Sequence, residues 1–257
     1  MSTQIYPDLK DKVALITGAS SGIGSATARC LAASGAKVVV NYWRNEKGAA
    51  ETVSAIAAEG GTALAVKADV SGSAGCAALI EATLKAFGPV DVLVNNAGSI
   101  VARLSILDLT EDQWDAVMDL NLRSVYLCTR AVARSMMERK RGAIVNMASI
   151  AARNGGGLGV AHYAASKAAV IAFSKGVAKE VAPHGVRVNC VAPGVIDTPL
   201  HEQFSTTAMM QGYVAAIPMA RVGTSAEVAS VIAFLCSEAS AYVCGETIEI
   251  NGAQLML

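Results

Sequence analysis

The sequence has little charge, and its charges balance in sign. Only 16% of the 257 residues are Asp, Glu, Lys or Arg, with 21 basic side chains against 21 acidic ones. A chain without net charge lacks the positive field that attracts DNA or an acidic membrane surface. We therefore expect no nucleic-acid partner.

Long apolar runs are missing as well. No segment approaches the roughly 18 uninterrupted apolar residues that a membrane-spanning helix needs. Residues 1–10 carry charged side chains and Pro7, where a secretory signal would need an apolar run. The sequence predicts a cytoplasmic protein with no membrane partner.

Histidine is scarce, and the cysteines are scattered. The chain has three histidines and six cysteines, with no Cys-x-x-Cys pair. In a chain of this length such cysteines are expected to be small buried apolar side chains in a reducing compartment. We predict no metal site.

Apolar side chains, in contrast, are abundant and regularly arranged. Hydrophobic residues make up 53% of the chain, and short β-branched runs alternate with Ala-rich segments of helical period, which is typical of repeated βα units. Strands are predicted at 13–17, 37–41, 63–67, 90–94, 143–147, 187–191 and 247–250. Helices are predicted at 22–33, 46–59, 75–87, 111–139, 163–182 and 225–235. The pattern predicts an α/β protein, a single doubly wound Rossmann-type domain over residues 1–257, with a seven-stranded parallel sheet and helices on both faces.

A glycine-rich turn joins the first predicted strand to the first predicted helix. Gly18 permits a tight turn, Gly22 lets the backbone approach a pyrophosphate, and Gly24 lets the helix pack closely. Free amides and the positive end of the helix dipole would face the phosphates. By itself the turn is equally compatible with a flexible loop, but the strand-turn-helix context predicts a dinucleotide site. Its predicted contacts are Gly18, Ser20, Ser21, Gly22, Ile23 and Gly24.

The end of the second strand bears on the choice of cofactor. NAD enzymes usually place an acidic residue there to bond the adenosine ribose, and this chain has none. Arg44, helped by Asn41 and the Ser20 or Ser21 hydroxyl, would accept a 2′-phosphate through charge-assisted bonds. NADP(H) is therefore favoured, and NAD(H) remains possible, because Arg44 pointing into water is the alternative.

Tyr163 and Lys167 stand four residues apart at the start of a predicted helix. Their side chains would therefore lie on one face, one turn from each other. A nearby ammonium and the positive nicotinamide ring would lower the pKa of the phenol and make it a usable acid-base group. The spacing alone arises by chance too often to identify an enzyme.

Further motifs follow the glycine turn in order along the chain. They are Asp69-Val70, then Asn95-Asn96-Ala97-Gly98, then Ser149, then Tyr163 to Lys167, each following the expected element, and the segment from Pro193 to Thr198 completes the pattern. This ordered set resembles the short-chain dehydrogenase/reductase family over essentially the whole chain. The 3-oxoacyl-(acyl-carrier-protein) reductase branch is the most similar, through Asn41-Tyr42 and the general layout.

The resemblance implies four catalytic residues. Tyr163 would be the general acid in reduction and the base in oxidation, and Ser149 would hydrogen-bond the substrate oxygen. Lys167 would bond the nicotinamide ribose and depress the pKa of Tyr163. Asn121 would anchor a water that links Lys167 to solvent. Taken singly, Ser149 is also explained as a strand end and Asn121 as a helix-bending residue.

The resemblance also implies further cofactor contacts. Asp69 would accept from the adenine amino group, although a turn-forming role is the alternative. Asn95 would fix the loop near the adenosine ribose, and Ile196 with Thr198 would hold the carboxamide. The remaining residues of the predicted cofactor site are Val70, Ala97, Gly98, Pro193 and Gly194.

The resemblance further implies a lid and a homotetramer. A helical lid over the substrate is expected at about 199–218, where Met209, Met210 and Tyr213 line the substrate site or pack the lid. The helices beginning at residues 111 and 163 would form one interface, and the last strand with the tail 255–257 another.

The function expected is NADP-dependent transfer of a hydride between nicotinamide and a carbonyl or alcohol carbon, on a 3-oxoacyl thioester or related ketone. A sugar or polyol dehydrogenase of the same family is an alternative. A non-catalytic NADP-binding sensor is another, but such proteins usually lose the Tyr-Lys pair. A P-loop phosphotransferase is disfavoured, since no lysine follows the glycine turn.

Three further features have weaker interpretations. The charged run 138–141 is expected to be a solvated helix end, with docking of an acidic carrier protein as the alternative. His162 is expected either to touch substrate or to sit partly exposed at a helix start. Tyr163 follows Ser149 by fourteen positions, one more than the commoner family spacing, so the extra residue in the loop is expected to reshape the pocket wall.

Overall fold

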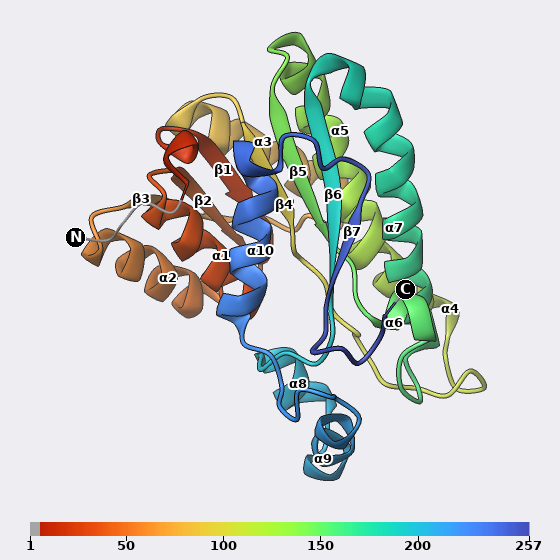
Figure 1. Ribbon diagram of the computed structural model, residues 1–257. Coiled ribbons are helices and arrows are strands. Elements are labelled where there is room, and N and C mark those ends of the chain that lie inside the picture. Colours follow the sequence, from red (N-terminus) through yellow and green to blue (C-terminus); the bar gives the residue numbers. More distant parts are fainter. Residues whose placement is uncertain (1–5, 257) are drawn as a thin grey trace.

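The computed structural model describes residues 6–256 and has a seven-stranded parallel sheet at its centre, ordered β3-β2-β1-β4-β5-β6-β7 (Figure 1). The strands are β1 (Val13–Ile16), β2 (Lys37–Tyr42), β3 (Thr62–Lys67), β4 (Val92–Asn95), β5 (Gly142–Met147), β6 (Val186–Pro193) and β7 (Thr247–Ile250). Every neighbouring pair is parallel. The predicted fold class is confirmed, and the strand bounds differ from those expected by at most two residues.

Helices cover both faces of the sheet, as predicted. One apolar core lies under α1 (Gly22–Ala33), α2 (Glu46–Ala58) and α10 (Ser225–Cys236). The other lies under α3 (Ser73–Phe87), α5 (Ser124–Glu138) and α7 (Ala161–Val181). Shorter helices are α4 (Glu111–Met118), α6 (Ala151–Asn154), α8 (Pro199–Phe204) and α9 (Thr207–Ala215), and 3-10 turns occur at Pro7–Leu9, Ala182–His184 and Glu238–Ser240.

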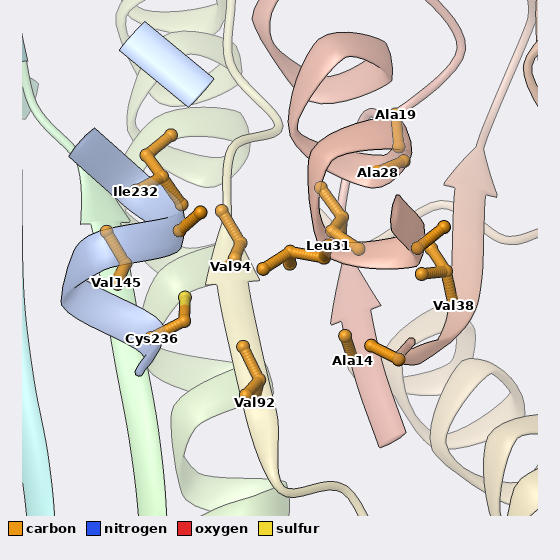
Figure 2. Close-up of a cluster of buried hydrophobic side chains, with 14 of the residues drawn as sticks. Ala14, Ala19, Ala28, Leu31, Val38, Val92, Val94, Val145, Ile232 and Cys236 are labelled. Carbon is orange, nitrogen blue, oxygen red and sulfur yellow. The ribbon is translucent and has the colours of Figure 1, made fainter. Parts of the chain in front are cut away.

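Burial on both faces explains why the central strand β1 is a continuous apolar run. All four residues of β1 are buried, and parallel strands with helices on each side have no solvent face to mark with polar residues. Figure 2 shows Leu31 of α1 and Ile232 of α10 on the same side of the sheet, over Val94 of β4. The two helices therefore lie side by side across the middle of the sheet.

The strand order indicates at which edge of the sheet a ligand would bind. Chain succession runs outward from β1 through β2 to β3, and then returns to β4 on the other side of β1. Ligands of doubly wound sheets bind outside the carboxyl ends of the strands at this reversal. Helices α8 and α9 project beyond that edge of the sheet (Figure 1).

The predicted helix at 111–139 is helical almost throughout, but it is not one regular α-helix. Helix α4 ends at Met118, a π-helical segment occupies Asp119–Arg123, and α5 follows. Within the π segment the side-chain amide of Asn121 donates to the Val117 carbonyl oxygen at 3.0 Å, so it occupies an acceptor of the regular helical ladder. Such π segments are common at functional sites.

The charged run 138–141 is not simply a solvated helix end. Arg139 donates to a carboxylate oxygen of Asp91 and to the Val90 carbonyl oxygen, and Arg141 lies 3.3 Å from the same carboxylate. These groups lie at the amino ends of β4 and β5, the edge opposite the nucleotide turn. A carrier protein bound there would not face the Ser149 site of the same chain.

No helix in the described part of the chain is long and apolar enough to cross a membrane. Within residues 6–256 no group of three His, Cys, Asp or Glu side chains is arranged to hold a metal ion.

Candidate active site

The glycine turn after β1 has the backbone conformation that its sequence predicts. Gly18 and Gly22 adopt φ values of +61° and +52°, in the left-handed region that favours glycine. A Cβ on Gly24 would lie 2.5 Å from both the Gly18 carbonyl oxygen and the Asn96 amide nitrogen. The turn therefore requires glycine at these positions.

The start of α1 is suited to a phosphate. Ser21 is the N-cap residue, and its side chain makes no capping hydrogen bond. The first amides of a helix have no intrahelical partners, so they are available to an anion. Ser20, Ser21 and Ile23 are all half-buried around this turn. The residues present therefore fit the pyrophosphate of a dinucleotide.

Asn41 does not have the predicted role in phosphate binding. It is 1% exposed; its side-chain oxygen accepts from the Gly18 amide at 3.2 Å, and its amide nitrogen donates to the Ala68 carbonyl oxygen at 3.0 Å. Both ends of the side chain are thus used inside the protein. Asn41 holds the glycine turn in place, so Arg44, which is exposed after β2, and the Ser20 or Ser21 hydroxyl remain as the candidates for binding a 2′-phosphate.

The loop-fixing role predicted for Asn95 belongs to its neighbour. Asn95 is buried, and its amide donates to Asn146 at 2.8 Å and to Thr129 at 3.2 Å, inside the fold. Asn96 instead donates to the carbonyl oxygens of Thr17 and Gly18 at 3.0 and 2.9 Å. Sequence reasoning missed Asn96 because the two asparagines are adjacent. Only the opposite directions of their side chains distinguish them.

The residues after β3 form a tight turn. One carboxylate oxygen of Asp69 accepts from the amide and the hydroxyl of Ser71 at 3.0 and 2.7 Å. Asp69 therefore forms a turn, as the alternative interpretation has it, and its second carboxylate oxygen has no hydrogen bond within residues 6–256. Val70 is buried beside it.

Tyr163, in the first turn of α7, meets Ser149, which follows β5. The Ser149 side chain is near enough to act on the phenol of Tyr163, and the Ser149 hydroxyl accepts from the Ala151 amide at 3.1 Å. Burial raises the pKa of Tyr163 above its usual value, and the neighbouring Ser149 hydroxyl opposes the rise. The expected lowering of this pKa is therefore wrong for the protein without nucleotide, because desolvation of the phenolate dominates.

Lys167 lies below Tyr163 on the same face of α7. Its ammonium nitrogen is 5.8 Å from the centre of the Tyr163 ring, and it donates to the Met147 carbonyl oxygen at 2.8 Å. The side chain is 2% exposed, and burial lowers the pKa of Lys167 to about 8, with an opposing contribution from the Cys190 thiol. The ammonium thus lies near the ring rather than bonding the hydroxyl.

Asn121 connects the π segment to the loop after β4. Its side-chain oxygen accepts from the Ser99 amide at 3.1 Å, and its amide donates to the Ser99 carbonyl oxygen at 2.9 Å. Gly98 lies between Asn121 and Lys167, since a Cβ there would be 2.6 Å from the Asn121 oxygen and 3.1 Å from the Lys167 nitrogen. The structure brings Asn121, Ser149, Tyr163 and Lys167 together at one edge of the sheet.

The segment after β6 closes the nucleotide side of this edge. A Cβ on Gly22 would lie 3.4 Å from the Thr198 methyl carbon, so Thr198 faces the glycine turn. The backbone of Ile196 pairs with Gly223. Pro193 and Gly194 lie at the end of β6, where the Gly194 amide donates to the Ile250 carbonyl oxygen at 2.9 Å.

Neither prediction for His162 is correct. The side chain is 1% exposed, and its Nε2 lies 3.1 and 3.0 Å from the carbonyl oxygens of Ile100 and Ala102. His162 therefore fastens the loop after Gly98 to the start of α7. The sequence carried no signal for this, because the two carbonyls belong to a remote segment.

A nucleotide-binding turn, a Ser-Tyr pair and a buried lysine on one helix are the parts of a nicotinamide-dependent oxidoreductase. A family model described as enoyl-(acyl carrier protein) reductase matches residues 18–252. The chain belongs to the short-chain dehydrogenase/reductase family, and it is an oxidoreductase that acts on carbonyl and CH–OH groups with a nicotinamide cofactor.

Two similar proteins and one solved structure show which members of the family this chain resembles. The chain is 47% identical over 249 residues, 96% of its length and 98% of the relative's, to 3-oxoacyl-(acyl-carrier-protein) reductase of Synechocystis sp.. It is 39% identical to the reductase FabG of Escherichia coli, covering 97% of this chain and all of that one. Among solved structures, an NADH-dependent reductase responsible for alginate metabolism superposes with a TM-score of 0.89 at 35% identity, covering 98% of this chain and 100% of that one.

Proposed function

We propose that this protein is an NADP-dependent reductase whose substrate is a 3-oxoacyl thioester or a related ketone. The names of its curated relatives support the substrate class. The observation that carries the reaction is that Ser149, Tyr163 and Lys167 meet at the edge of the sheet beside the nucleotide turn. Two neighbouring hydroxyls can both bond one carbonyl oxygen placed between them and the cofactor.

The chemistry divides among four side chains. The bound nicotinamide supplies or accepts the hydride. Ser149 donates to the carbonyl oxygen and holds it, and Tyr163 gives its proton to that oxygen as negative charge develops there. Lys167, whose pKa is lowered to about 8 by burial, can return a proton near neutral pH. We assign Asn121 to the path from Lys167 to solvent, and in oxidation each proton moves in reverse.

We infer the preference for NADP from the end of β2. Arg44 is exposed there and has neither an ion pair nor a side-chain hydrogen bond within residues 6–256. Tyr42, at the position where an acidic residue would bind the ribose of NAD, is buried. A guanidinium without a carboxylate partner suits a 2′-phosphate.

Steady-state kinetics with both cofactors tests this preference. We expect the wild type to have the higher kcat/KM with NADPH, and Arg44→Ser to lower it about 10- to 100-fold, as loss of charge-assisted bonds would. The same variant should leave the value for NADH nearly unchanged. Lys47→Ser, which removes an exposed cation from α2, is the matched control. Equal or faster turnover of the wild type with NADH would refute the assignment.

The substrate is identified by comparing a panel of compounds, and not by a variant of the enzyme. NADPH consumption should be fastest with 3-oxoacyl thioesters, compared with simple ketones and with sugars or polyols in the oxidising direction. Fastest turnover of a sugar or polyol would instead support the alternative dehydrogenase. Tight NADPH binding without turnover of any compound would support the non-catalytic sensor.

We also propose that residues 1–257 form one domain, that 199–218 is the lid, and that the chain assembles as a homotetramer. Tyr126 of α5 is 40% exposed and, with Phe173 of α7, lines an apolar hollow between the two helices, which supports one interface. The partly exposed edge strand β7 supports the other; of its tail, residue 257 lies outside the described residues. A molar mass near four chains in light scattering would agree. All six cysteines are unpaired, which supports a cytoplasmic location.

A further inference from the structure

Arg103 connects three segments that are far apart in the sequence. It lies in the loop between β4 and α4, where its Nε donates to the Phe204 carbonyl oxygen at 3.1 Å. Its Nη1 donates to the Leu158 carbonyl oxygen. Phe204 is the last residue of α8 in the lid, and Leu158 belongs to the loop 155–160 between α6 and α7.

The loop 155–160 packs directly on the Arg103 side chain. A Cβ on Gly159 would lie 2.9 Å from Arg103 Cγ, and a Cβ on Gly157 would lie 3.5 Å from its Nη1. Gly159 also has a φ of +75°, which glycine adopts without strain. The loop presents the Leu158 carbonyl oxygen to the guanidinium.

Arg103 donates its hydrogen bonds to carbonyl oxygens and not to carboxylates. Within residues 6–256 no carboxylate lies within salt-bridge distance of its guanidinium, although the residue is half-buried. The Phe204 carbonyl is at the carboxyl end of α8, where carbonyls lack helical partners and carry partial negative charge. A guanidinium bonds such groups more strongly than a neutral donor does.

We propose that Arg103 is a positioning residue that fixes the lid over Tyr163 and Ser149 by joining α8 to the loop 155–160. The proposal rests on the proposed reductase function for its kinetic consequence. Both of its partners flank the substrate side of the edge: the loop 155–160 leads into the helix that carries Tyr163, and α8 follows Thr198, which faces the nucleotide turn. Arg103 thus sets the distance between the nucleotide side and the substrate side of the pocket.

A second, uncharged contact supports the same closed arrangement. The hydroxyl of Tyr213 in α9 would be 3.2 Å from a Cβ on Gly157, and its ring packs edge-on against His201 of α8. His201 in turn lies 3.0 Å from the Ser205 hydroxyl. The lid therefore rests on the glycine loop at two points, and Arg103 supplies the stronger one.

The test compares Arg103→Met and Arg103→Lys in the full-length enzyme. Arg103→Met keeps an apolar stem but loses both hydrogen bonds. We expect KM for the ketone to rise about tenfold, in line with the loss of charged hydrogen bonds, while the Kd for NADPH stays within twofold. Arg103→Lys should recover KM in part. Arg221→Met, which removes an exposed arginine paired with Glu227, is the matched control and should leave KM unchanged.

Amide hydrogen exchange gives a readout that needs no substrate. Residues 199–215 should exchange about tenfold faster in Arg103→Met than in the wild type or in Arg221→Met. Millimolar guanidinium added to Arg103→Ala should slow that exchange again. If the wild type turns over no ketone, the reductase proposal fails while the exchange data still test Arg103. Unchanged lid exchange together with unchanged KM in Arg103→Met would overturn the inference.

Discussion

The two sides of the pocket are built in different ways. On the nucleotide side, a local glycine motif sets the backbone of the turn, since Gly18 and Gly22 have positive φ values. The side chains of Asn41 and Asn96 reinforce this turn from the ends of other strands. On the substrate side, loops are held by long-range side-chain contacts. The difference explains why the cofactor class can be recognised from a motif, whereas the substrate cannot.

Burial follows the same division. Strands β1 and β4, which lead to the glycine turn and to the Asn96 loop, are fully buried, and no residue of α8 or α9 is buried. Elements with few buried apolar contacts open at lower free-energy cost than core elements. Substitutions on the nucleotide side should therefore change cofactor affinity, and those on the substrate side should change KM or kcat.

The largest expected effect is that of Tyr163→Phe. Removing the hydroxyl removes the proton donor, so kcat for NADPH-dependent reduction should fall about a thousandfold, within the usual range for a general acid. The Kd for NADPH, measured by fluorescence titration, should change less than twofold. Tyr242→Phe, at a fully exposed tyrosine, is the control. A Tyr163→Phe enzyme that keeps most of its rate would contradict the assignment.

Gly24→Ala should act on the nucleotide side alone. The added Cβ would lie 2.5 Å from the Gly18 carbonyl oxygen and from the Asn96 amide, and overpacking of this kind costs about 1–3 kcal/mol. Because the turn would have to shift to relieve this close contact, NADPH binding should weaken about 10- to 100-fold.

The matched control is Gly176→Ala in α7, where a Cβ would meet nothing within 4 Å. This variant should bind NADPH normally and gain about 0.5–1 kcal/mol of stability from the better helix former. Equal losses of NADPH affinity in both variants would show that the loss does not arise from the close contact in the turn.

A smaller effect concerns pH and Lys167. Burial lowers its pKa from the ordinary 10.5 to about 8, so between these values the unfolded chain binds more protons than the folded one. Stability contributed by this residue must then rise with pH in that interval. From pH 8 to 10 the wild type should gain about 1–2 kcal/mol relative to Lys167→Met in urea unfolding.

Loss of the hydrogen bond to Met147 in Lys167→Met adds an offset that does not vary with pH. Lys179→Met, which removes an exposed lysine of the same helix, should show a constant difference from the wild type across the interval. A constant difference for Lys167→Met would mean that the buried ammonium is solvated as well as a surface one.

Periodicity and local motifs were sufficient for the sheet and for the proximity of Asn121, Ser149, Tyr163 and Lys167, and they failed where a side chain meets a remote segment. The seven strands follow from β-branched runs, and the glycine turn follows from its own backbone requirements. Asn41, His162 and Arg103 were misassigned or missed because their partners lie on other loops. The π segment was missed because it is a single turn, Asp119–Arg123, within a longer helical segment.

Asn96 links the glycine turn to the loop beside Lys167. One side-chain amide holds two successive carbonyls at the end of β1, and its own backbone leads within two residues to Gly98, against which Lys167 rests. The glycine turn and the loop beside Lys167 are therefore joined directly to each other. A displacement of the turn would be transmitted to that loop, so we expect a ligand bound at one to affect the other.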